Sequence, residues 1–178
     1  MYTYTSNNKE TRYTVMNYFS EFSSVFRRRA DAVARINGSE MYQNIHGKVL
    51  FYTVRVGVIV RSIITGLPKG TKPCGSPIFA FHIHSGGRCD GNENDAFANA
   101  AGHYNPQNCP HPYHAGDLLP LFGANGNAFS AFLTDRFRVS EIIGKTVIIH
   151  SSFDDFTTQP SGNAGEKIAC GVIMPNVR

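Results

Sequence analysis

The sequence contains no tryptophan and little charge. Of its 178 residues, 17% are charged and 42% are hydrophobic, the latter an ordinary value for a globular protein. A chain of this length forms one well-buried domain and leaves no length for a second. The low charge and the missing tryptophan fit a protein rich in β-strands and loops, without demanding one.

The sequence also lacks a long apolar run and a concentrated basic patch. No run approaches the roughly 20 residues that a membrane-spanning helix needs. The net charge is +4, and the basic residues are scattered apart from Arg27, Arg28 and Arg29. Binding to nucleic acid or to a membrane surface needs clustered positive charge. We therefore expect neither partner.

Residues 1–30 form an N-terminal extension without the marks of a signal peptide, which are a basic start, a continuous apolar core and a small-residue cleavage site. This favours a cytoplasmic location. Residues 14–29 instead carry an apolar residue every three or four positions, which predicts an amphipathic helix. We expect the helix to cover the following domain or a neighbouring subunit of a homodimer, with membrane docking as the less favoured alternative.

Residues 31–178 consist of short β-branched and aromatic runs separated by turns. The runs predict strands over residues 32–36, 48–54, 58–67, 78–84, 128–134, 146–150 and 167–173. Arg55, Val56 and Gly57 offer a tight reversal between the second and the third. Strands at this spacing predict an all-β fold, an antiparallel sandwich or flattened barrel.

Histidine is the strongest chemical signal. Six of the seven histidines fall between residues 82 and 150, at His82, His84, His103, His111, His114 and His150, and His46 stands apart. Strand alternation places Phe81 and Ile83 on one face and His82 and His84 on the other. The two imidazoles start about 7 Å apart and can share one metal ion. Two surface histidines on a half-buried strand are the alternative for this pair alone.

The second histidine cluster lies in a segment that turn-forming residues keep from being a long strand or helix. These residues are Gly102, Asn105, Pro106, Pro110, Pro112 and Gly116. The loop offers three imidazoles and one carboxylate, from His103, His111, His114 and Asp117. Such a set suits tetrahedral zinc and leaves no position for water, which predicts a structural rather than a hydrolytic site.

Several motifs, taken in order, resemble the copper/zinc superoxide dismutase family over residues 30–178. They are His82-Ile83-His84, Gly102-His103-Tyr104-Asn105-Pro106, His114-Ala115-Gly116-Asp117-Leu118, the run from Gly144 to His150, Gly162-Asn163-Ala164-Gly165 and the run from Ala169 to Ile173. The resemblance implies a Greek-key barrel with long metal-binding and electrostatic loops. It also implies an oxidoreductase that disproportionates superoxide to dioxygen and hydrogen peroxide by Cu(II)/Cu(I) cycling.

The resemblance further implies two metal sites that share one histidine. Copper would be bound by His82, His84, His103 and His150, and zinc by His103, His111, His114 and Asp117. His103 would bridge the two metals. Asp154 matches a carboxylate that orients His82 and His111. For its neighbour Asp155 we prefer the alternative of a solvated turn.

Two of the four cysteines, Cys89 and Cys170, match the family's intrasubunit disulfide. Closing that loop would stabilise the fold by roughly 4 kcal/mol in the chain-entropy model. Cys74 and Cys109 have no counterpart in the family. For Cys109 the alternatives are a spare thiolate ligand, a partner for Cys74, or an ordinary loop residue, which we favour.

Two departures from the family pattern bear on activity. Lys167 stands where the family usually has an arginine beside copper, which keeps the charge and loses the planar fork. We expect His103 and Lys167 to be catalytic and a basic channel near Lys167 to draw in the anion. The zinc loop is shortened, with only Pro112 and Tyr113 between His111 and His114.

These departures motivate one rival function, a non-catalytic metal-binding protein of the same family. A zinc hydrolase is a second rival. It is disfavoured because no carboxylate base stands beside an open three-ligand site, as such chemistry requires.

Overall fold

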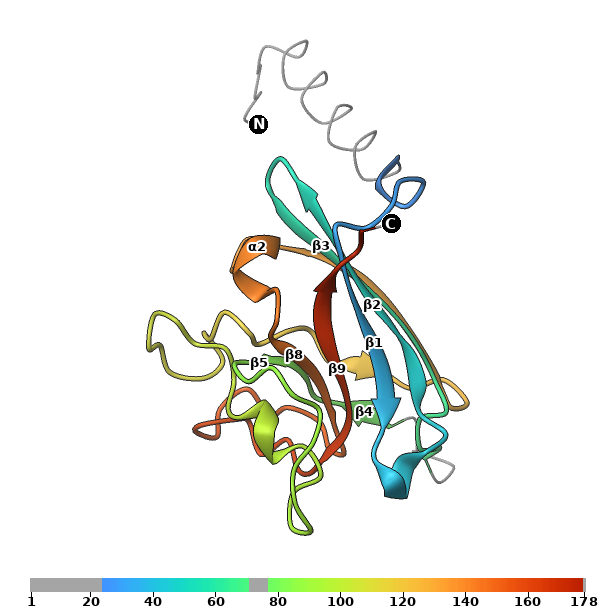
Figure 1. Ribbon diagram of the computed structural model, residues 1–178. Coiled ribbons are helices and arrows are strands. Elements are labelled where there is room, and N and C mark those ends of the chain that lie inside the picture. Colours follow the sequence, from blue (N-terminus) through green and yellow to red (C-terminus); the bar gives the residue numbers. More distant parts are fainter. Residues whose placement is uncertain (1–23, 71–76, 178) are drawn as a thin grey trace, which may run out of the picture. The chain divides into compact units, whose positions relative to one another are not determined.

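The computed structural model describes residues 24–70 and 77–177. The chain divides into two units, residues 1–30 and 31–178, and each is described by itself (Figure 1). In the first unit, Ser24 and Val25 are helical and the helix ends before Phe26. The rest of the predicted helix, residues 14–23, lies outside the described residues. Within the described ranges, no helix has the length and apolarity to cross a membrane.

The second unit is made almost entirely of strands. Its elements in the described residues are β1 (Ala32–Gly38), η1 (Glu40–Tyr42), β2 (His46–Val54), β3 (Gly57–Thr65), β4 (Ile78–Phe79), β5 (Phe81–His84), η2 (Ala98–Ala100), β6 (Leu121–Phe122), β7 (Asn127–Thr134), α2 (Val139–Ile142), β8 (Thr146–His150) and β9 (Lys167–Pro175). The predicted all-β class is confirmed.

Seven strands form one antiparallel sheet in the order β5-β8-β9-β1-β2-β3-β7, and β4 pairs with β6 in a second, small sheet. Several neighbours in the large sheet are far apart in sequence, notably β1 and β9, and β3 and β7. Two long loops, residues 85–120 and 151–166, leave the strands β5 and β8, which lie side by side (Figure 1).

The predicted reversal between β2 and β3 is present. Val54 pairs with Gly57, so Arg55 and Val56 form a two-residue turn. Strand β3 ends at Thr65, two residues earlier than expected. Gly66 follows with φ of 75°, and a Cβ there would overlap the carbonyl of Asn44. The chain therefore turns at Gly66, where glycine adopts a positive φ at little cost.

The strand expected over residues 78–84 is divided, and this corrects the prediction. Strand β4 pairs with β6, whereas β5 pairs with β8. Between them, Ala80 donates its N–H to the carbonyl of Ser152 at 2.7 Å and accepts from the N–H of His150 at 2.9 Å. Both bonds tie the junction to the end of β8, so His150 is held next to the strand that carries His82 and His84.

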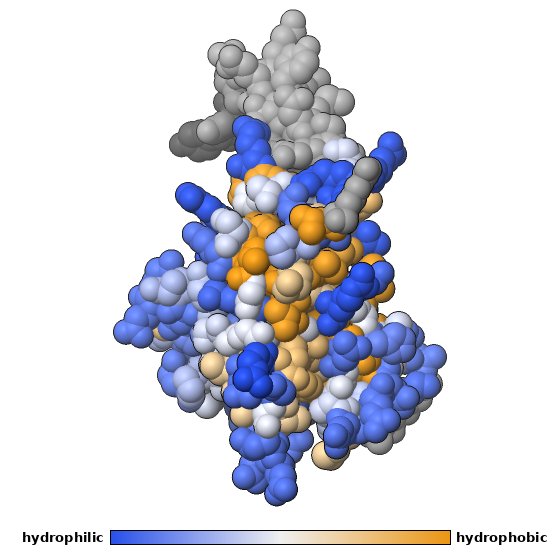
Figure 2. Space-filling view, viewed as in Figure 1, coloured by the Kyte–Doolittle hydropathy of each residue, from blue (hydrophilic) through white to orange (hydrophobic). Residues whose placement is uncertain are grey.

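A single main core unites the inward faces of the strands. Its fully buried side chains include Ile36, Phe51, Phe79, Phe81, Ile83, Leu121 and Ile149. Figure 2 shows hydrophobic residues over the strands in the middle of the viewed face and hydrophilic residues over the loops around them. The core fixes the strands, and the strands fix where the two long loops begin and end.

Candidate metal centre

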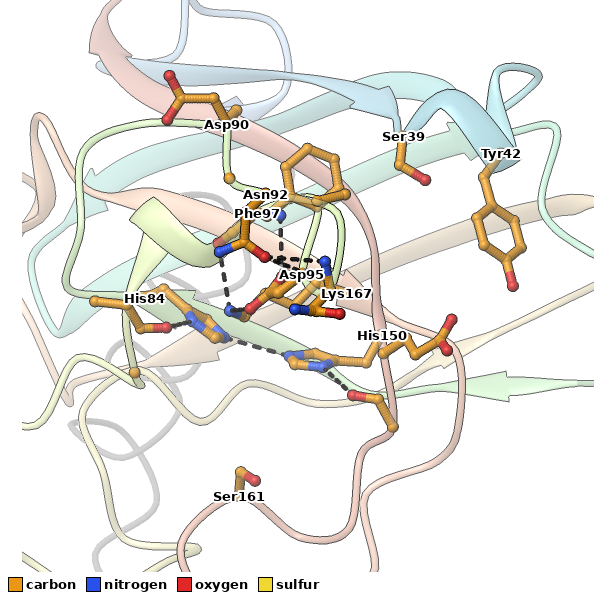
Figure 3. Close-up of a pocket in the computed structure, with 18 of the residues that line it drawn as sticks. Ser39, Tyr42, His84, Asp90, Asn92, Asp95, Phe97, His150, Ser161 and Lys167 are labelled. Atoms are coloured by element: carbon orange, nitrogen blue, oxygen red, sulfur yellow. Dashed lines mark hydrogen bonds and ion pairs between the residues drawn. The ribbon is translucent and has the colours of Figure 1, made fainter.

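The first donor set forms where β5 and β8 run side by side. His82 and His84 come from β5, His150 is the last residue of β8, and His103 reaches them from the loop of residues 85–120 through a bridge to His84. One ligand atom from each of these four residues lies within 4.8 Å of the others. The Nε2 atoms of His84 and His150 are 3.3 Å apart (Figure 3). Strand β5 is buried at all four positions, so the alternative of two surface histidines on a half-buried strand is wrong.

The second donor set lies in the loop and contains His103, His111, His114 and Asp117, whose ligand atoms again lie within 4.8 Å of one another. Asp117 Oδ1 is 2.7 Å from His103 Nδ1, and Asp117 Oδ2 is 3.0 Å from His111 Nδ1. His103 belongs to both sets. Its Nδ1 faces Asp117, while its Nε2 is buried without a hydrogen-bond partner.

The buried nitrogens of both sets fit metal ions. In the described residues, His82 Nδ1, His103 Nε2 and His111 Nδ1 are buried and have no hydrogen-bond partner. Buried polar atoms in proteins almost always make a hydrogen bond, and coordination of a metal cation can replace that bond for an imidazole nitrogen. Four imidazoles suit copper, and three imidazoles with a carboxylate suit zinc.

Asp154 joins the two donor sets from behind. Its Oδ2 accepts from His82 Nε2 at 2.8 Å and its Oδ1 from His111 Nε2 at 2.9 Å. Because an ionised carboxylate only accepts, each imidazole presents its Nε2–H and leaves a lone pair on Nδ1. Each Nδ1 atom faces its own donor set. The tautomer with the proton on Nε2 is therefore the one that metal binding requires.

Gly162 makes room for this contact. It has φ of 67°, and a Cβ there would overlap Asp154 Oδ1 and press on His111 Nε2. Any other residue would displace the carboxylate or the imidazole. The Gly162-Asn163-Ala164-Gly165 motif is therefore the sequence signal of the Asp154 contact.

Burial keeps the histidines neutral. Desolvation lowers the pKa of His82 to about 4, against the opposing hydrogen bond to Asp154, and desolvation lowers that of His150 to about 3. Burial also lowers the pKa of His84 well below 6.5. Desolvation raises the pKa of Asp154, but the hydrogen bonds that its carboxylate accepts outweigh this effect and lower the pKa to about 2. At neutral pH, His82, His84 and His150 are therefore free bases and Asp154 is charged, as metal binding needs.

Arg136 clamps the short zinc loop. Its Nη1 donates to the backbone carbonyls of Pro112 at 3.0 Å, His114 at 3.3 Å and Asp117 at 3.2 Å. All three carbonyls belong to the loop between His111 and Asp117. A single guanidinium thus fixes the backbone that the shortening would otherwise leave less constrained.

Gln159 holds the start of the same loop. Its side-chain oxygen accepts from the N–H of His111 at 2.9 Å, and its amide donates to the carbonyl of His111 at 2.7 Å. Neither Arg136 nor Gln159 was predicted from the sequence. Their partners lie 19 to 48 residues away, so only the fold brings them together.

Lys167 begins β9 and pairs with His150 across the sheet. Both line a cleft of about 1320 Å³ that opens beside the first donor set (Figure 3). The prediction of a basic channel is wrong for the described residues. Lys167 is the only lysine or arginine lining this cleft, together with the carboxylates of Glu40, Asp90, Glu93, Asp95 and Glu166.

Cys89 and Cys170 form a disulfide with their Cα atoms 5.6 Å apart, which links the loop of residues 85–120 to β9. Cys109 is a free thiol outside both donor sets. Its backbone N–H and carbonyl bond the side chain of Asn105, which fits an ordinary loop residue. Cys74 lies outside the described residues. His46 contacts Asn44 and Thr65, away from both sets.

Comparison with known proteins agrees with this geometry. The family model described as copper/zinc superoxide dismutase matches residues 45–173. The Cu-Zn superoxide dismutase of Legionella pneumophila is 38% identical over 135 residues, which cover 71% of this chain and 76% of the relative. Cu-Zn superoxide dismutase 2 of Aquifex aeolicus is 32% identical over 142 residues, covering 71% and 78%.

The solved structure of Cu/Zn superoxide dismutase from Brucella abortus has a TM-score of 0.66 and 22% identity, and the match covers 79% of this chain and 98% of that chain. At this identity the likeness concerns the fold alone. The family match and the curated relatives carry the assignment, and the motifs of the sequence agree with them. The chain belongs to the copper/zinc superoxide dismutase family.

Proposed function

We propose that the first donor set binds copper and the second binds zinc, and that the chain disproportionates superoxide at the copper site. The observation that carries this proposal is the pair of four-ligand sets that share His103. The buried nitrogens of His82 and His103 that make no hydrogen bond support it, and His111 Nδ1 lies 3.0 Å from Asp117 Oδ2, a member of the same donor set. Homology to enzymes named superoxide dismutase supports the same reaction.

Copper, when bound, supplies a one-electron cycle that converts two superoxide anions and two protons to one dioxygen and one hydrogen peroxide. The protein contributes ligands held in a fixed tautomer and a cleft that admits a small anion. His82 and His150 are neutral and buried, so they offer lone pairs without competing protons over a wide pH range.

His103 belongs to both donor sets, and its two ring nitrogens have different partners. Its Nδ1 is held on the zinc side by Asp117, so its ring is fixed while Nε2 faces away from that carboxylate. We assign to Nε2 the task of binding copper or, when released, of holding one proton. Asp117, whose carbonyl Arg136 bonds, would keep the ring in place together with zinc bound in the second set.

The test is turnover by protein reconstituted with copper and zinc, compared with the His84→Ala variant. His84 belongs to the first set alone, so its loss should abolish superoxide turnover while zinc is retained. Wild-type protein that holds both metals and does not turn over superoxide would favour the non-catalytic alternative. A homodimer remains a prediction that the same preparation can test by light scattering.

A further inference from the structure

Among the described residues, Lys167 is the one lysine or arginine that lines the cleft beside the first donor set, and it is already paired. Lys167 Nζ donates to Asp95 Oδ2 at 2.5 Å and to the carbonyl of Phe97 at 3.3 Å. The Lys167 side chain is 15% exposed and that of Asp95 is 37% exposed, so the pair lies at the wall of the cleft and within reach of solvent. In Figure 3 the two side chains meet beside Phe97 and near His84 and His150.

Asp95 is fixed independently of Lys167. Its Oδ1 accepts from the N–H of Phe97 at 3.0 Å, and its own N–H donates to Asn92 Oδ1 at 3.1 Å. The carbonyl of Asp95 accepts from the N–H groups of Asn92 and Ala98. These bonds build a tight turn, and the disulfide at Cys89 anchors the same loop. The carboxylate is therefore a rigid acceptor for the lysine.

Position and charge together give Asp95 a role. Lys167 sits opposite the copper ligand His150, where a positive charge would attract an incoming anion. The carboxylate 2.5 Å from Nζ cancels most of that attraction and occupies a hydrogen-bond donor that the anion would need.

We propose that Asp95 is a positioning residue that sets the anion affinity of the copper site by neutralising Lys167. This inference rests on the proposed function. An anion entering the cleft must compete with Asp95 for the ammonium group. Removing the carboxylate charge should therefore raise anion affinity, and the effect should pass through Lys167.

The experiment compares wild type with Asp95→Asn, both loaded with copper and zinc. Asparagine keeps an oxygen for the N–H of Phe97, but it loses the charge and replaces the oxygen that accepts from Lys167 with an amide donor, so the lysine is released. We expect kcat/KM for superoxide at low ionic strength to rise on the order of threefold to tenfold and to fall more steeply as salt is added. Azide, titrated optically at the copper site, should bind tighter by a similar factor.

Two variants separate this role from a general change in charge. Glu93→Gln also removes one negative charge from the same loop and from the lining of the cleft. Its effect on azide affinity and on the salt dependence of kcat/KM should be clearly smaller than that of Asp95→Asn. In a Lys167→Gln background, Asp95→Asn should alter neither azide affinity nor the salt slope. An equal effect in that background would show that Asp95 does not act through the lysine and would overturn the proposal.

The azide titration also separates the two proposals. If wild type holds copper but fails to turn over superoxide, the proposed function fails, and azide affinity still decides the role of Asp95. If wild type is active but Asp95→Asn matches it in salt slope and azide affinity, the role of Asp95 is refuted and the proposed function stands.

Discussion

Asp154 Oδ2 accepts a hydrogen bond from His82 Nε2 at 2.8 Å, across 72 residues of sequence and with both side chains buried. The same carboxylate holds His111, so one residue orients a ligand in each donor set. The Asp154→Ala variant should lose both contacts. We expect the affinity for each metal to fall by about 10- to 100-fold, measured by competition with chelators.

Asp155 provides the matched control for this test. Its carboxylate bonds only the neighbouring Thr157 and Thr158, in a local turn. The Asp155→Ala variant should leave the affinities for both metals unchanged. Equal losses in the two variants would mean that the loop as a whole, rather than the Asp154 contacts, holds the ligands.

Arg136 should matter for zinc more than for copper. The Arg136→Ala variant removes three hydrogen bonds to the zinc loop and none to β5 or β8. We expect zinc affinity to fall by about tenfold, which is roughly the worth of one hydrogen bond to a charged group, because the three bonds act on zinc only through the backbone of the loop. Arg138→Ala, an equal loss of charge at an exposed position, should leave zinc affinity unchanged. A larger loss of copper than of zinc would contradict this role.

Metal-free protein should lose stability as the pH falls below 6.5. The unfolded chain takes up protons on its histidines near pH 6.5, whereas folded His82 resists protonation down to about pH 4. Between these values the unfolded state binds more protons, so the free energy of unfolding decreases as pH falls. His82 alone corresponds to a loss of about 3 kcal/mol across this range. Urea unfolding at several pH values measures it.

The His150→Gln variant is the comparison for the pH experiment. It removes a second buried histidine whose pKa desolvation lowers to about 3, so its pH profile should be flatter than that of wild type. A wild-type profile without slope between pH 6.5 and 4 would contradict neutral, buried histidines.

The Cys89–Cys170 disulfide should stabilise the domain substantially, since it joins residues 81 apart in sequence. Reduction should lower the free energy of unfolding by roughly 4 kcal/mol. The measurement is urea unfolding with and without reductant, in wild type and in Cys109→Ser. Both proteins should lose the same amount, because Cys109 is not bonded. A loss that disappears in Cys109→Ser would point to a different pairing.

Much of the fold could be predicted from local pattern. Strands β1, β2, β8 and β9 begin and end within two residues of their predicted bounds. Burial alternates along β1 and leaves a period-two pattern in the sequence, whereas β8 is buried throughout and is a short run of β-branched residues. The division of residues 78–84 left no such pattern. It depends on Ala80 bonding Ser152 and His150, which is a contact between distant segments.

The donor sets followed from motif order, whereas their supports did not. Arg136 and Gln159 bond backbone atoms, which every residue type has. No sequence motif therefore indicates which residues they contact. The pairing of Lys167 with Asp95 likewise joins residues 72 apart. The sequence predicted a positive charge near copper, and only the fold revealed that a carboxylate neutralises it.

The central claim is that two distinct metals share His103, and metal analysis paired with turnover tests it most directly. Protein reconstituted with copper and zinc should contain one of each per chain and should disproportionate superoxide. The His84→Ala variant should keep zinc and lose both copper and turnover. Protein that takes up zinc at both positions and refuses copper would contradict the claim.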